Sequence, residues 1–173
     1  MQAMGLVERT QAALAGLFPG PVAPAVPPAE EGGQEAPPPR ETGVLVTDQA
    51  RHGSHLDVLC RPDQVVETAR VLDREGYFLE SISGADWPDQ GRFEVIYDYS
   101  RLGGEHCRVT VRTFADRGEP VLPTISGVFP AADWHERETF DFYGIHFQGH
   151  PNLIRILLPE DADFYPLRKD YMP

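Results

Sequence analysis

The chain has 173 residues, of which 41% are apolar and 24% charged, and its formal net charge is −12. This length and composition are typical of one soluble globular domain with a tail. The acidic excess argues against a nucleic-acid partner, because it would repel a phosphate backbone and no basic run is longer than Arg168-Lys169.

The sequence contains no apolar stretch near the roughly 20 residues that a membrane helix needs, since Arg155 interrupts the best candidate, Leu153 to Leu158. The N-terminus lacks the basic start of a secretory signal, which favours cytoplasmic residence. Cys60 and Cys107 lie in alternating, strand-like runs and are expected to be buried core thiols. Because an iron–sulfur cluster takes four thiolates, any such centre is expected on another chain.

Residues 1–18 predict a short helix with Leu6, Ala13, Leu14 and Leu17 near one face. A linker over residues 19–42 follows, and eight of the 17 prolines fall between Pro19 and Arg40. Stretched as polyproline II, about 20 such residues reach on the order of 60 Å. Two readings stay open: the linker carries the helix onto a neighbouring subunit, or the segment is a disordered tail.

Residues 43–145 predict one α+β domain. Alternating patterns indicate strands at 44–47, 55–60 and 77–82, and an apolar stripe indicates a helix over 64–75 with Asp63 as its cap and Gly76 as its stop. Two longer alternating runs, 93–99 and 107–113, flank Gly103-Gly104 and predict a hairpin. The fold expected is a small α/β sandwich with a mixed or antiparallel sheet that helices cover on one side.

A second helix is expected from Pro130 to Tyr143, with Gly144 as its stop. Asp133, Arg137 and Asp141 lie four apart, so both carboxylates can reach the arginine. Such charges usually mark a solvated surface helix. Here, however, the aromatic residues between them leave little purely polar surface, which favours a buried, paired contact with another protein.

The segment 146–173 is expected to be an irregular, extended C-terminal arm. One alternative gives it enzymatic chemistry: a metal-dependent hydrolase would use Glu136 or Glu138 as its base and His146 and His150 as ligands. The spacing opposes this reading, because the histidines follow a helix-ending glycine and do not share one helical face. We therefore predict no catalytic, cofactor-binding or metal-ligating residue on this chain.

The region from Glu136 to Asp170 resembles the complex I 30-kDa subunit family, whose members belong to NADH:quinone oxidoreductase. The resemblance rests on short motifs spread along the helix and the arm: Glu136-Arg137-Glu138, Asp141-Phe142-Tyr143-Gly144-Ile145, Gly149-His150-Pro151, Arg155-Ile156-Leu157 and Pro166-Leu167-Arg168-Lys169-Asp170. It is dense over residues 126–171 and looser over 43–114.

The resemblance implies a cofactor-free scaffold subunit of a peripheral arm. Its partners would be a quinone-site large subunit and the small subunit with the terminal iron–sulfur cluster; flavin and other clusters would lie on further partners. It also implies a peripheral location on the cytoplasmic side of the cell membrane, reached only through partners, and a supporting role in electron transfer coupled to ion translocation. Nine residues are carried over as interface or structural positions: Glu136, Arg137, Glu138, Asp141, His150, Arg155, Arg168, Lys169 and Asp170.

Two kinds of host complex stay open. The chain has Ile154 where the family has a second arginine, and Ala162 and Tyr165 where it often has tryptophan and histidine. Compact versions of this subunit also resemble those of membrane-bound nickel–iron hydrogenases and formate hydrogenlyases. In these hosts the hydrogenase-like large subunit, not this chain, would hold the nickel and iron.

Overall fold

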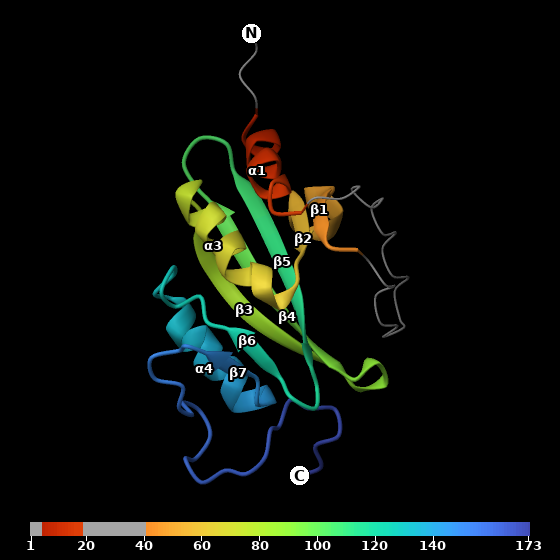
Figure 1. The fold of residues 1–173 in the computed structure, drawn as a ribbon, viewed down its shortest axis with the longest axis vertical. Coiled ribbons are helices and arrows are strands. Elements are labelled where there is room, and N and C mark those ends of the chain that lie inside the picture. The colour runs from red at the N-terminus through yellow and green to blue at the C-terminus, as the bar shows by residue number, and fades with distance from the viewer. Residues whose placement is uncertain (1–4, 19–40) are drawn as a thin grey trace.

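The computed structural model describes residues 5–18 and 41–173 (Figure 1). Over these residues the chain forms a five-stranded sheet in the order β1-β2-β5-β4-β3 and a two-stranded sheet of β6 and β7. The strands are β1 (Gly43–Val46), β2 (Leu56–Leu59), β3 (Phe78–Trp87), β4 (Arg92–Arg101), β5 (Cys107–Asp116), β6 (Val121–Pro123) and β7 (His146–Gln148). The α-helices are α1 (Leu6–Ala15), α2 (Gln49–His52), α3 (Val65–Arg74) and α4 (Ala132–Tyr143).

The large sheet is mixed, as the sequence predicts. Strand β2 pairs with β5 in parallel, whereas β1/β2, β3/β4 and β4/β5 are antiparallel. The predicted hairpin is confirmed: Arg101 of β4 lies opposite Cys107 of β5. Gly103 and Gly104 in its turn both have positive φ, a conformation that glycine adopts without steric cost.

One face of the large sheet carries the core, beneath α3, α4 and the small sheet (Figure 1). Alternate residues of the central strands point into it and are almost fully buried: Phe93, Val95, Tyr97 and Tyr99 of β4, and Cys107, Val109 and Val111 of β5. Burying a side chain of the size of Phe93 stabilises the fold by about 2 kcal/mol. Cys60 and Cys107 are buried and free, as predicted.

Helix α1 packs on the domain itself, against β1 and α3. Leu6, Leu14 and Phe18 are buried in the core, and the Thr10 hydroxyl lies 2.9 Å from that of Tyr77. The helix therefore has a docking face on its own chain. The predicted linker falls almost wholly outside the described residues, so its proposed reach stays a prediction.

Several element boundaries differ from those expected. The helix predicted over 64–75 begins with a 3-10 turn at Pro62–Gln64, and Asp63 pairs with Arg61 at 3.0 Å instead of capping it. Strand β3 runs on to Trp87, past a bulge between Leu79 and Ser81. Helix α4 begins at Ala132 and stops, as predicted, at Gly144, whose φ is 75°.

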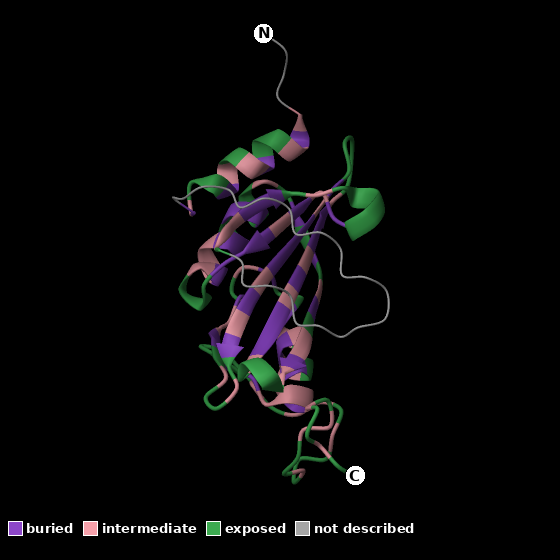
Figure 2. Cartoon of the chain, turned by 90° about the vertical axis from the view of Figure 1, so that its right-hand side faces the viewer, coloured by how far each residue is buried: buried purple, intermediate pink, exposed green. Residues whose placement is uncertain are grey.

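The C-terminal arm is mostly irregular, with exposed and half-buried residues dominating its turns (Figure 2). It differs from the expectation at its start. His146–Gln148 forms β7, which pairs in parallel with β6 and buries Phe147. Apolar burial of Phe147 thus fixes the start of the arm on the domain.

Candidate assembly site

Helix α4 lies against β3, and a glycine permits the close approach. A Cβ atom at Gly84 would lie 2.7 Å from the Tyr143 ring. In its absence the Tyr143 hydroxyl donates a 2.8 Å hydrogen bond to the Gly84 carbonyl. This contact places the polar residues of α4 between the sheet and the arm.

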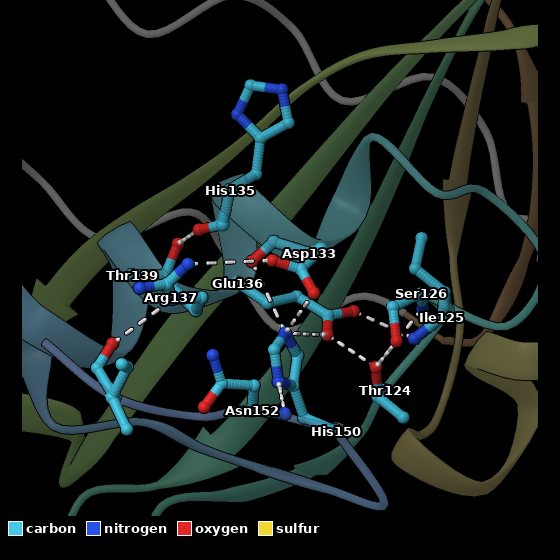
Figure 3. A network of polar contacts seen from close by, with 11 residues as sticks. Thr124, Ile125, Ser126, Asp133, His135, Glu136, Arg137, Thr139, His150 and Asn152 are labelled. Carbon is cyan, nitrogen blue, oxygen red and sulfur yellow. Dashed lines mark hydrogen bonds and ion pairs between the residues drawn. The ribbon is translucent and has the colours of Figure 1, made fainter. Parts of the chain in front are cut away.

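Glu136 is fully buried beneath the loop that follows β6 (Figure 3). One carboxylate oxygen accepts the Ile125 N–H at 2.7 Å, and the other accepts the Thr124 hydroxyl. Burial raises the pKa of Glu136 to about 7; these two hydrogen bonds oppose that rise, and the charge on Asp133 adds to it. The residue ties α4 to residues 124–126.

His150 lies beside Glu136 with its ring fully buried (Figure 3). Its Nδ1 accepts the Asn152 N–H at 3.1 Å, so its Nε2 carries the proton and faces the Asp133 carbonyl at 3.2 Å. The Nε2 lies 3.9 Å from the Glu136 carboxylate. These contacts fit a neutral imidazole that anchors the arm under the first turn of α4.

Arg137 and Glu138 have different surroundings. The Arg137 side chain is 11% exposed, lies 3.8 Å from Asp133, donates to the Ile154 carbonyl at 3.3 Å and covers the Trp134 ring. Glu138 is exposed and has no hydrogen bond or ion pair to any of the residues that the structure describes. Among the nine predicted positions, Glu138 is therefore the one whose side chain is most open to a partner.

Asp141 is buried at the other end of α4 and binds the arm. Burial raises its pKa, but the N–H groups of Ile156, Leu157 and Leu158, together with Arg155, outweigh this effect and lower it. The three N–H groups donate to Oδ2 at 2.7–3.0 Å, and Arg155 donates to Oδ1 at 2.8 Å. The carboxylate therefore holds a whole turn of the arm.

This geometry corrects one prediction. The spacing of Asp133, Arg137 and Asp141 predicted that both carboxylates would pair with the arginine, yet Asp141 pairs with Arg155. The physical reason is that the three N–H groups of the folded arm, together with an arginine, solvate a buried carboxylate more completely than one exposed-face contact can.

Arg155 and Arg168 fasten the arm to itself and to the end of α4. Arg155 donates to the carbonyls of Asp141 and Ala162 at 2.9 and 2.6 Å. Arg168 donates to the Tyr143 carbonyl at 2.7 Å. A Cβ atom at Gly144 would lie 2.7 Å from Arg168, so this glycine is required both for its positive φ and for the close packing.

The last of the predicted positions bind to β3 through two residues that the sequence analysis missed. Asp86 is buried, accepts two hydrogen bonds from Arg117 at 2.8 and 3.1 Å, and accepts the Lys169 N–H at 2.8 Å. Arg117 also pairs with Asp170 at 2.8 Å. Hydrogen bonds from Asp86 and then Asp170 raise the pKa of Arg117, and that from Arg117 lowers the pKa of Asp170.

Asp86 had a signal in the sequence. It continues the alternation of Ile82 and Gly84 on the inner face of β3, so a longer strand would have placed a carboxylate in the core. Thr124 and Arg117, in contrast, lie in segments without a periodic pattern. Only the tertiary contacts identify them.

The arm and α4 together expose large apolar side chains, although their backbone is held by buried polar contacts. Trp134 on α4 is 63% exposed, and the arm contributes Ile154, Leu157, Phe164, Leu167 and Met172, which are 37–86% exposed. We call these six residues the apolar patch. Exposed apolar side chains of this size, gathered on two adjoining segments, are typical of a protein-binding surface.

The described residues give no support to the metal-dependent hydrolase. Among residues 5–18 and 41–173, no three His, Cys, Asp or Glu side chains are placed to hold a metal ion. His146 is exposed, whereas His150 is enclosed by backbone groups. No helix within the same residues is long and apolar enough to cross a membrane.

Residues 58–173 match the family described as the 30 Kd subunit of respiratory-chain NADH dehydrogenase. The chain belongs to this family. The match includes α4, the arm and Asp86, so all nine predicted positions lie within the family region. It excludes α1 and β1.

Relatives of the 30-kDa family are named as subunits of NADH-quinone oxidoreductase. The Roseiflexus sp. protein is 39% identical over 130 residues, which cover 72% of this chain and 74% of its own length. That of Rhizobium meliloti is 43% identical over 136 residues, 75% and 72% of the two chains. The Chloroherpeton thalassium protein is 45% identical over 94 residues, which cover 54% of this chain but only 39% of its length.

Two solved structures share the fold. The trypsin-resistant fragment of Nqo5 is 32% identical, with a TM-score of 0.52, over 57% of this chain and 82% of the fragment. A chain of the membrane-bound sulfane sulfur reductase, an archaeal respiratory membrane complex, is 25% identical, with a TM-score of 0.61, over 68% of this chain and 71% of its own. Chains similar to this one are thus subunits of multi-subunit respiratory complexes.

Proposed function

We propose that this chain is a cofactor-free scaffold subunit in the peripheral arm of a membrane-bound NADH:quinone oxidoreductase. In this role it packs beside the quinone-site subunit and the subunit with the terminal iron–sulfur cluster. It lies on the cytoplasmic side of the membrane and reaches the membrane only through these partners. It supports electron transfer coupled to ion translocation by holding its neighbours in place.

One observation carries this proposal: the apolar patch is displayed by a backbone that buried charges hold rigid. Asp141, Asp86 and Glu136 bind backbone N–H groups of 124–126 and of the arm, so the patch is ordered before a partner arrives. A preordered surface loses less conformational entropy on binding than a flexible one. That is the expected property of an assembly subunit.

A second host is favoured by one of the structural likenesses. The sulfane sulfur reductase shows that this fold also serves a respiratory membrane complex that is not named for NADH or quinone. The alternative is therefore the equivalent subunit of a membrane-bound nickel–iron hydrogenase or formate hydrogenlyase. The same patch would then bind a hydrogenase-like large subunit.

The identity of the partner chains tests both hosts. The full chain, tagged at one end, is purified from gently solubilised membranes, and the accompanying chains are identified by mass spectrometry. A nucleotide-binding flavoprotein together with iron–sulfur subunits is expected. A nickel–iron large subunit would support the alternative host, and recovery of the chain alone from intact membranes would overturn the scaffold role.

A further inference from the structure

We propose that Glu136 is a proton-binding site of the folded chain, and that protons reach it from a surface pocket through the hydroxyls of Thr124 and Ser126. Such a property belongs to the chain itself and does not depend on the host complex. It gives Glu136 a role beyond that of a structural contact.

The pocket lies where α3, the loop after β6 and the start of the arm meet. It has a volume of about 540 Å³, and its lining includes Thr124, Ser126, Asp133 and Arg70. Thr124 and Ser126 are both partly exposed, whereas Glu136 is fully buried just behind them. The two hydroxyls therefore stand between the pocket and the carboxylate.

The hydrogen bonds form an unbroken chain from the pocket to the carboxylate (Figure 3). The Ser126 hydroxyl lies 2.8 Å from that of Thr124, which in turn contacts Oε2 of Glu136. The Ser126 N–H also donates to the Thr124 hydroxyl at 3.1 Å. Each hydroxyl has one donor and two acceptor positions, which these contacts are able to fill.

Both protonation states satisfy this chain. When Glu136 is charged, Thr124 donates to it and Ser126 donates to Thr124. When Glu136 is neutral, its own O–H donates to Thr124, and Thr124 donates to Ser126. Because the same oxygen atoms keep the same neighbours, the proton is accepted without moving the backbone.

The transfer conserves protons. A hydronium ion in the pocket gives one proton to the Ser126 oxygen, which releases its own to Thr124, and Thr124 releases its own to Glu136. Three O–H bonds form and three break, counting that of the hydronium ion. The net change is one proton bound at Oε2 and one water left in the pocket.

The surroundings of Glu136 favour a proton over a cation. Asp133 on the same helix adds negative charge, and His150 on the arm is held neutral by its two backbone contacts. Tyr97 and Tyr99 of β4 face it as neutral phenols, since burial raises the pKa of each well above its ordinary value. Arg70 at the pocket pairs with Glu67 at 3.3 Å. Among the described residues no lysine or arginine pairs with Glu136.

A carboxyl carbon signal in NMR tests the site. The full chain is labelled with ¹³C at the glutamate side-chain carboxyls and titrated from about pH 5 to about pH 9. One signal is expected to change with a midpoint near 7, to vanish in Glu136→Gln and to persist in Glu138→Gln, the exposed control on the same helix. A midpoint for Glu136 near about 4.3, the usual glutamate value, would overturn the proposal.

The exchange behaviour of that signal tests the route. With a working hydroxyl chain, exchange is fast and one peak moves continuously with pH. Thr124→Val, which removes the hydroxyl but keeps the shape, is expected to give two separate peaks, and Thr124→Ser is expected to restore the single peak. A single moving peak in Thr124→Val refutes the route through Thr124.

A milder variant guards against misfolding of the valine variant. Ser126→Ala retains the contact between Thr124 and Glu136 and removes only the outer hydroxyl. Its Glu136 signal is expected to broaden near the midpoint, because exchange slows. A Glu136 signal as sharp as that of the unaltered chain would remove Ser126 from the route.

Discussion

Arg155 and Asp141 lie 2.8 Å apart, and their contact joins the arm to the end of α4. Both side chains are almost wholly enclosed, with 10% of Arg155 and none of Asp141 exposed. The same carboxylate binds three successive N–H groups of the arm. A buried pair of this kind fixes a conformation, because neither charge has water to replace its partner.

Replacing Asp141 by asparagine is expected to lower the free energy of unfolding by about 3 kcal/mol, since Arg155 is left buried without its counter-charge. Chemical denaturation measures the change. Glu138→Asn, on the exposed side of the same helix, is the control and is expected to change it by less than about 0.5 kcal/mol. Equal effects of the two substitutions would contradict the role of Asp141.

Glu136 is expected to make the chain less stable as the pH rises through neutrality. Its pKa is about 7 in the folded chain, against an ordinary 4.5, so the folded chain binds the proton more tightly than the unfolded one. Its contribution is fully present below about pH 4.5 and declines through pH 7, by about 3 kcal/mol in all. Denaturation at a series of pH values measures it. Glu136→Gln should remove this dependence, and an unchanged slope would contradict the assignment.

Gly144→Ala is expected to destabilise the arm. Alanine at this positive φ costs about 1–2 kcal/mol, and its Cβ would also displace Arg168 and Tyr165. Gly103→Ala is the matched control, because φ is 93° there and nothing lies within 4 Å of the added carbon. Limited proteolysis should cut the arm faster in the first variant only. Equal cleavage of both variants would count against the close packing at Gly144.

Leu157→Asp is expected to release the chain from its partners while leaving its fold intact. Leu157 is 60% exposed within the apolar patch, so the substitution affects binding rather than the core. Leu102→Asp, at the 68% exposed tip of the β4–β5 hairpin, is the control. Co-purification from membranes compares the two. Retained binding of Leu157→Asp at full expression would exclude the patch from the interface.

Arg137→Ala is expected to weaken assembly as well. The substitution removes the contacts of Arg137 with Asp133, the Ile154 carbonyl and the Trp134 ring, and thereby loosens two residues of the apolar patch. Arg137→Lys keeps the charge but not the planar contact and is expected to restore binding only in part. The amount of partner recovered per amount of chain measures both. Full recovery with alanine would refute the prediction.

Local sequence patterns were sufficient to predict the α+β class, the β4–β5 hairpin and the ends of several elements. These patterns are the alternation over 93–99 and 107–113, the paired glycines at 103 and 104, and the stop at Gly144. The motifs from Glu136 to Asp170 also identified the family, which the match over residues 58–173 confirmed. Such features are predictable because a strand or a turn is specified largely by its own residues.

The pairing of the charges, in contrast, depends on the tertiary structure. Spacing along α4 predicted Arg137 between two carboxylates, whereas the fold gives Asp141 to Arg155 and to three N–H groups of the arm. Asp86 and Arg117 lie 31 positions apart, and no periodicity links them. The free energy of a buried charge depends on every group that surrounds it, whatever its distance along the chain. Burial, too, is a property of the whole fold, and it is burial that turns Glu136 from a surface acid into one with a pKa of about 7.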